Sequence, residues 1–220
     1  MGKVKKIGLP YLSPMISKPL LLILFVFGAL TQATSQSTPI PTPDEFLGYQ
    51  LGSRFTPHSQ VVEYFKKVDQ ASEQVKLETY GETYEGRPLI AAIVSSAANM
   101  KRLEEIRLNN LRRSGFWDGT PVQEDIAIVY LSYSVHGNEA AGSESSIAVL
   151  YDLVSGNPTI KGWLDHAVVI LDPSLNPDGY SRYTQWSNSV SSTPFNPNPD
   201  AREHHEPWPG GRFNHYYFDL

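Results

Sequence analysis

Two apolar runs separated by a helix-like segment leave this 220-residue chain few ways to fold. Residues 125–134 (DIAIVYLSYS) and 167–175 (AVVILDPSL) are almost continuously apolar, which is typical of strands covered on both faces. Residues 139–156 (EAAGSESSIAVLYDLVSG) between them are expected to form a helix, ended by Gly156. Strands alternating with helices predict an α/β sandwich with a mixed sheet.

The residues before this unit continue the same alternation. Residues 59–72 have apolar side chains at helical spacing, and residues 75–96 read as two strands around a glycine-containing turn. Residues 99–113 are expected to form a helix capped by Asn99. We therefore predict a three-layer α/β/α sandwich with a mixed, mostly buried sheet. From residue 176 onward the pattern is lost, which indicates a long loop that is functional or disordered.

The amino-acid composition excludes several kinds of function. The chain has no cysteine, so disulfides, a cysteine nucleophile and a cysteine-held zinc are excluded. The formal net charge is only −5, and no Lys/Arg-rich patch with interleaved aromatic residues is present. No nucleic-acid partner is therefore expected. Any metal ion must be held by histidine and carboxylate side chains.

The N-terminus has the pattern of an export signal. Several lysines precede the apolar run PLLLILFVFGAL, and small residues follow it, with possible cleavage after Ala33 or Ser35. An uncleaved anchor is the alternative, but the run is shorter than the roughly 20 residues of a spanning helix. We predict a signal peptide over 1–35, a proline-rich linker over 36–49 and the main domain over 50–220. The protein would be exported to the periplasm or the extracellular space, touching the membrane only through this signal.

His136 and Glu139 are the first candidate site residues. His136 directly follows the first apolar run, and Glu139 lies where the next helix is expected to begin. A three-residue step places two side chains on the same side of a helical turn. In open α/β sheets, strand ends border the crevice in which ligands bind. An imidazole and a carboxylate are zinc ligands, although a catalytic zinc usually has three protein ligands.

The same four residues, His-Gly-Asn-Glu, also fit an ordinary helix start. Asn138 could cap the helix, and Glu139 would then face the positive end of the helix dipole. Two later segments are equally ambiguous when taken alone. Asn-Pro-Asp-Gly at 176–179 fits a tight turn, and Arg212 in a glycine-flanked loop fits solvated surface.

Taken together, the three segments resemble the zinc carboxypeptidase A-like family, peptidase M14. The resemblance rests on His-Gly-Asn-Glu after a strand, on Asn-Pro-Asp-Gly, and on an arginine seven residues before Asp-Leu. It covers roughly residues 50–220, and WPGGRFNHYYFDL is particularly similar to large secreted bacterial members. The resemblance implies a carboxypeptidase-like fold, Zn²⁺ as cofactor and a peptide or protein as substrate.

The resemblance also implies a role for four residues. His136 and Glu139 match the first two zinc ligands of the family. Arg212 matches the arginine that polarises the scissile carbonyl and stabilises the oxyanion. Asp219 matches the carboxylate that orients the first ligand histidine, as zinc sites generally require.

Two parts of the family's machinery have no counterpart in this chain. These are the third zinc ligand, a histidine, and the general-base glutamate. The other five histidines match no ligand position, and we interpret them as loop, surface or structural residues: His58, His166, His204, His205 and His215. We therefore expect a C-terminally truncated, N-terminal portion of the catalytic domain, inactive alone.

The predicted function is that of a zinc-dependent metallocarboxypeptidase. Amidase or deacylase activity on the same scaffold is left open by these motifs. A non-catalytic exported domain that binds peptides or cell wall is the alternative from another class. A helix-anchored structural protein, suggested only by the N-terminal run, is a third.

Overall fold

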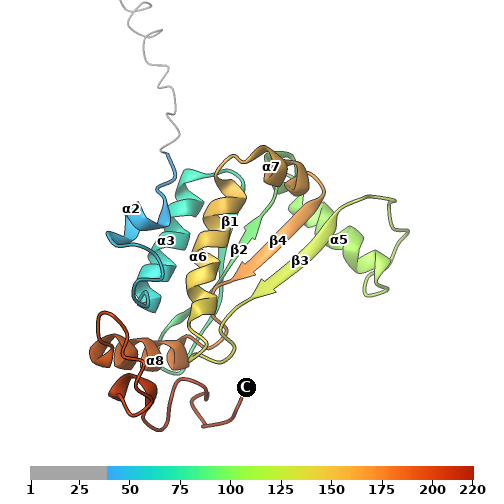
Figure 1. The fold of residues 1–220 in the computed structure, drawn as a ribbon. Coiled ribbons are helices and arrows are strands. Elements are labelled where there is room, and N and C mark those ends of the chain that lie inside the picture. The colour runs from blue at the N-terminus through green and yellow to red at the C-terminus, as the bar shows by residue number, and fades with distance from the viewer. Residues whose placement is uncertain (1–38) are drawn as a thin grey trace, which may run out of the picture. The chain divides into compact units, whose positions relative to one another are not determined.

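The computed structural model describes residues 39–220, which form an α/β fold around a single sheet (Figure 1). The strand order is β1-β2-β4-β3. β1 (Val75–Glu82) pairs antiparallel with β2 (Pro88–Val94), which pairs antiparallel with β4 (Ala167–Asp172). β3 (Ala127–Ser132) pairs parallel with β4. The sheet is therefore mixed, as predicted, and its parallel pair is formed by the two apolar runs.

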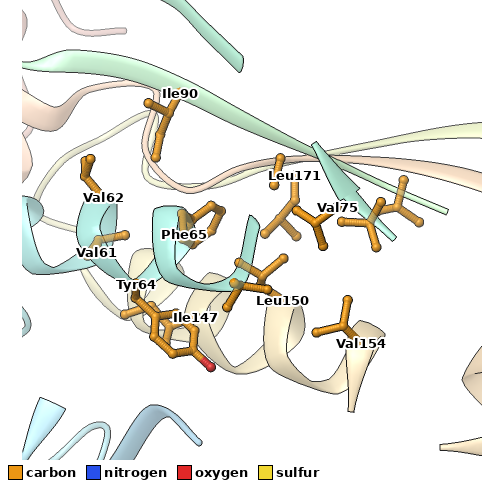
Figure 2. Close-up of a cluster of buried hydrophobic side chains, with 14 of the residues drawn as sticks. Val61, Val62, Tyr64, Phe65, Val75, Ile90, Ile147, Leu150, Val154 and Leu171 are labelled. Atoms are coloured by element: carbon orange, nitrogen blue, oxygen red, sulfur yellow. The ribbon is translucent and has the colours of Figure 1, made fainter. Parts of the chain in front are cut away.

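Helices α3 (His58–Ala71) and α6 (Ala141–Val154) pack against one face of this sheet. Figure 2 shows the side chains between them, with Phe65 of α3 and Leu150 of α6 among the fully buried residues. Leu171 of β4 belongs to the same buried cluster. Burying a side chain of this size contributes about 1.5–3 kcal/mol to folding. This core fixes the strand ends on which the candidate site is built.

Strand β3 differs from the central, doubly covered strand that its composition predicts. Among residues 39–220 it pairs only with β4 and forms an edge of the sheet. Val129 and Tyr130 are 39% and 56% exposed. Neighbouring β4 is largely buried, as predicted. Apolar composition shows which side chains tolerate burial, whereas a strand's place in the sheet depends on the partners available to it.

The region after residue 175 does not lack secondary structure, because it begins with helix α8 (Pro177–Val190). Asn176 caps this helix by accepting a hydrogen bond from the Gly179 N–H at 2.9 Å. A proline and an aspartate in the first turn complete an ordinary helix start. Tyr180 is fully buried and donates to the Thr56 carbonyl oxygen at 2.6 Å. Figure 1 shows α8 and the C-terminal segment below the arrowheads of β3 and β4.

The helix predicted over 99–113 is divided into α4 (Ala97–Met100) and α5 (Leu103–Arg113). Its cap is Ser96 and not Asn99, because the Ser96 hydroxyl accepts the hydrogen bond from the Asn99 N–H. The buried Asn99 amide instead donates to two carbonyl oxygens at the end of α7 (Pro158–Leu164) and directly after it. A short polar side chain that could cap a helix can also make a tertiary contact.

The described part of the expected linker belongs to the domain. Helix α2 (Pro43–Leu47) begins with a reciprocal capping box between Thr42 and Glu45. Leu47 is buried, and the Tyr64 hydroxyl donates to the Pro41 carbonyl oxygen at 3.1 Å. The predicted signal peptide over 1–35 lies outside the described residues. Within residues 39–220, no helix combines the length and apolar character needed to cross a membrane.

Candidate metal centre

The segments that follow β3 and β4 run side by side, which brings the first two motifs together. The Tyr133 N–H donates to the Asp172 carbonyl oxygen at 3.1 Å, and the Asn176 N–H donates to the Ser134 carbonyl oxygen at 3.2 Å. These bonds continue the strand pairing beyond the sheet. Ser134 has a φ of 48°, in the left-handed region, just before His136. His136 thus lies at the end of β3, where the sequence predicts it.

A tight turn in the C-terminal segment brings Arg212 and Asp219 together. Phe213 and Asp219 form an antiparallel bridge across this turn. Within it, the side-chain oxygen of Asn214 accepts two main-chain N–H groups at 2.9 and 3.0 Å. The Arg212 Nε then donates to Asp219 Oδ1 at 2.8 Å.

The structure brings all four predicted site residues into one cluster. His136 Nδ1 lies 3.1 Å from Glu139 Oε1, and His136 Nε2 lies 3.2 Å from Asp219 Oδ1. Arg212 Nη1 lies 3.3 Å from His136 Nδ1 and 3.9 Å from Glu139 Oε1. Two residues from the end of β3 therefore meet two residues from the C-terminal turn.

The two ring nitrogens of His136 have different neighbours. In a neutral imidazole with its ring N–H on Nε2, that N–H would donate to Asp219 Oδ1, 3.2 Å from Nε2. Nδ1 then carries a lone pair and faces a carboxylate oxygen of Glu139. Two such atoms repel unless a cation lies beside both, and here the Arg212 guanidinium does so. The geometry therefore favours positive charge next to His136 and Glu139.

Charge pairing keeps the two C-terminal residues ionised. The hydrogen bond from Arg212 lowers the pKa of Asp219 below its ordinary value. The same bond raises the pKa of Arg212. Asp219 is thus a carboxylate at neutral pH and can accept the His136 N–H.

Three glycines, one from each motif, meet backbone to backbone next to this cluster. A Cβ on Gly137 would lie 2.0 Å from the Tyr180 nitrogen, and one on Gly179 would lie 2.1 Å from the Gly211 oxygen. A Cβ on Gly211 would lie 2.6 Å from the Gly179 oxygen. No side chain fits at these distances. The three motifs can therefore approach one another only because each has glycine at the contact.

Two polar residues that sequence reasoning did not single out hold the motifs together. Glu206 accepts hydrogen bonds from the Gly211 N–H and, at 3.0 Å, from Asn138 Nδ2, so Asn138 is not a helix cap. Asn176 donates to the Phe213 carbonyl oxygen at 3.1 Å while capping α8. The helix-start pattern could have identified Asn176. No local pattern identifies Glu206, because its importance comes from a partner distant in sequence.

Zinc fits part of this arrangement. The 3.1 Å between His136 Nδ1 and Glu139 Oε1 is close to the roughly 3.3 Å separation of two ligands on a tetrahedral zinc. Within residues 39–220, however, no three His, Cys, Asp or Glu side chains are grouped so that they could hold a metal ion. The described residues thus supply two suitable donors, one fewer than a catalytic zinc usually has.

The remaining histidines do not complete the site. His204 Nε2 lies 2.7 Å from the Asn196 carbonyl oxygen, and the His215 ring stacks on Tyr84 with centroids 4.7 Å apart. His205 is exposed. These three occupy the loop and surface positions expected of them.

The sequence model of the zinc carboxypeptidase family, peptidase M14, matches residues 61–215, well over half of the chain. The chain therefore belongs to this family of metallocarboxypeptidases. Membership implies Zn²⁺ as the metal of the complete site. The match includes His136, Glu139 and Arg212, whereas Asp219 lies just beyond it.

Individual relatives match over stretches of different length. Carboxypeptidase Z of Rattus norvegicus is 32% identical over 134 residues, which cover 58% of this chain and 17% of that protein. Probable carboxypeptidase 2 of Trichophyton verrucosum is 35% identical over 72 residues, covering 33% of this chain and 13% of that protein. The crystal structure of carboxypeptidase A from Helicoverpa armigera aligns with a TM-score of 0.44 and 18% identity, covering 74% of this chain and 32% of that chain. This chain thus spans less than a fifth of the length of these two curated relatives.

Proposed function

We propose that this chain is part of an exported bacterial zinc metallocarboxypeptidase that hydrolyses peptide bonds through a metal-activated water. The observation that carries the proposal is the cluster of His136, Glu139, Arg212 and Asp219, in which His136 Nδ1 faces Glu139 Oε1 beside the Arg212 guanidinium. Family membership supports the reaction class. Export rests on the N-terminal pattern of lysines, apolar residues and small residues.

His136 and Glu139 would hold the zinc ion in this proposal. Asp219 would act through His136. By accepting a hydrogen bond from the Nε2–H group it would fix the ring orientation and leave the Nδ1 lone pair for the metal ion. Zinc, when bound, lowers the pKa of a coordinated water and polarises a peptide carbonyl.

Arg212 would stabilise negative charge on the carbonyl oxygen of the substrate. Its Nε is held by Asp219 and its Nη1 lies next to His136 Nδ1, whereas its Nη2 has no hydrogen-bond partner among residues 39–220. Fixed donors aimed at a developing oxyanion are usually the largest electrostatic contribution to such a reaction.

The cluster lacks a general base as well as a third ligand. Glu139 and Asp219 are the carboxylates within it, and both already have roles. We propose that a further segment of polypeptide supplies the missing ligand and base. The 220-residue chain alone should then have little or no peptidase activity.

Peptide hydrolysis by the product of the complete reading frame tests this function. The assay compares a peptide that has a free C-terminal carboxylate with the same peptide carrying a C-terminal amide. We expect a chelator-sensitive release of the last residue from the free peptide alone. Arg212→Ala should lower kcat/KM by about 10²- to 10³-fold, whereas Arg202→Ala, at an exposed position of the short 3-10 helix Arg202–His204, should not.

Equal cleavage of both peptides would exclude a carboxypeptidase, and insensitivity to chelators would exclude a metal-dependent reaction. A folded product that hydrolyses neither peptide and takes up no zinc would favour the exported binding domain instead.

A further inference from the structure

A cleft of about 420 Å³ lies between the start of α3, the turn that joins β1 to β2, and one side of α8. None of His136, Glu139, Arg212 and Asp219 lines it. Its volume is in the range of small-molecule sites. It therefore needs an explanation separate from the proposed reaction.

One wall of the cleft is a helix start with unused donors. Pro57 occupies the N-cap position of the 14-residue helix α3, and no side chain caps this end. Within residues 39–220, the main-chain N–H groups of His58 and Ser59 have no acceptor. Free N–H groups at the positive end of a helix dipole favour an anion.

Two buried side chains face the same space without a partner. His58 in α3 is 6% exposed and Ser181 in α8 is 5% exposed, and both line the cleft. Neither the imidazole nor the hydroxyl hydrogen-bonds to another of the described residues 39–220. Among the described residues, the polar atoms that are both unpaired and sealed from solvent do not include those of His58 or Ser181. The polar atoms of these two side chains therefore remain accessible from the cleft. Both side chains therefore have hydrogen-bonding capacity left for a molecule that enters this cleft.

The charged residues around the cleft are already paired. Arg87 Nη1 lies 2.6 Å from both Glu85 and Asp178, and Lys66 lies 2.8 Å from Glu63. The carboxylates thus have cationic partners, whereas the donors at the start of α3 and on α8 have no acceptor among residues 39–220. The cleft thus combines paired charges with helix-start N–H groups that have no acceptor among residues 39–220.

The His58 ring contributes a donor without a buried charge. Burial, and next the nearby Arg87, lower the pKa of His58 to about 4, while Asp178 opposes this shift. At neutral pH the imidazole is therefore uncharged and has one N–H.

We propose that this cleft binds a small molecule through an oxyanion, a carboxylate or a phosphate. The anion would accept hydrogen bonds from the first-turn N–H groups of α3, the His58 imidazole and the Ser181 hydroxyl. This site is independent of the proposed peptidase function and uses none of its residues.

Calorimetric titration of the 220-residue chain tests the proposal, with inorganic phosphate and acetate as separate probes at constant ionic strength. NMR of the histidine rings identifies whether the His58 resonances shift with the same saturation curve. Ser181→Ala should weaken binding about fivefold, as expected for one lost hydrogen bond. Ser189→Ala, an exposed serine on the same helix that does not line the cleft, is the matched control and should bind normally.

Saturable binding of phosphate alone assigns a phosphate ligand, and binding of acetate alone assigns a carboxylate. The proposal is overturned if neither anion saturates, or if binding leaves the His58 resonances unchanged. Equal affinities of the Ser181→Ala and Ser189→Ala chains would also overturn it. Should Ser181→Ala fail to fold, the shift of the His58 resonances on addition of each anion to the unaltered chain still decides whether the anion binds in the cleft.

Discussion

At the scale of single residues, the candidate site depends on groups that carry no chemistry of their own. Gly137, Gly179 and Gly211 permit the close approach of three backbone segments. Glu206 and Asn176 then join those segments by hydrogen bonds. The chemistry-bearing residues could be predicted from sequence because their motifs, taken together, resemble a known family. The supporting residues could not be ranked, because a glycine or glutamate has many ordinary uses.

Gly137→Ala should be strongly destabilising, because the added methyl group would meet backbone atoms of α8 that cannot move independently. We expect a loss of at least about 3 kcal/mol in the free energy of unfolding, measured by urea denaturation. Gly162→Ala in α7 is the control, because nothing lies within 4 Å of its added Cβ. That change should be neutral or stabilise by about 0.5–1 kcal/mol. Equal effects of the two substitutions would refute the close glycine contact.

His58 should make the stability of the fold depend on pH. Its folded-state pKa of about 4 lies below the ordinary 6.5, so the unfolded chain takes up the proton first as the pH falls. The contribution of His58 to the free energy of unfolding is complete above about pH 6.5 and is lost progressively toward pH 4. The total loss is roughly 3 kcal/mol. Urea denaturation between about pH 7 and pH 5 should show this loss in the unaltered chain. The slope should be smaller in His58→Asn, and an unchanged slope would show that His58 titrates normally.

At the scale of elements, periodicity and turn chemistry identified most helices and strands. α3, α6, the β1–β2 hairpin and β4 follow directly from their sequence patterns. α8 was missed because Asn-Pro-Asp-Gly fits a turn as well as a helix start, and its buried residues are mostly polar. The edge position of β3 could not be predicted, because strand order depends on long-range pairing and not on local composition.

Asn176→Ala tests whether the residue that caps α8 also positions the candidate metal centre. The side chain caps α8 and also donates to the Phe213 carbonyl oxygen next to Arg212. We expect a loss of about 1–2 kcal/mol in unfolding free energy, together with weaker zinc binding. The control is Asn157→Ala, which removes only the cap of α7. Asn157→Ala should lower the free energy of unfolding by about 1 kcal/mol and leave zinc affinity unchanged. An equal loss of zinc affinity in both variants would count against a role of Asn176 in positioning the site.

At the scale of the whole molecule, the described residues form a packed α/β core that presents an incomplete site. The family assignment follows from a match over residues 61–215, and the four predicted site residues converge in space. Family resemblance predicted that convergence, which local patterns alone could not. The two donors, without a third, predict that the chain holds zinc weakly.

Zinc titration of the 220-residue chain tests this account most directly. We expect weak, saturable uptake of one zinc ion that is lost on His136→Ala or Glu139→Ala. His205→Ala should retain this uptake, because the His205 side chain is exposed and lies outside the cluster. Absence of saturable uptake, or uptake that survives both His136→Ala and Glu139→Ala, would contradict it.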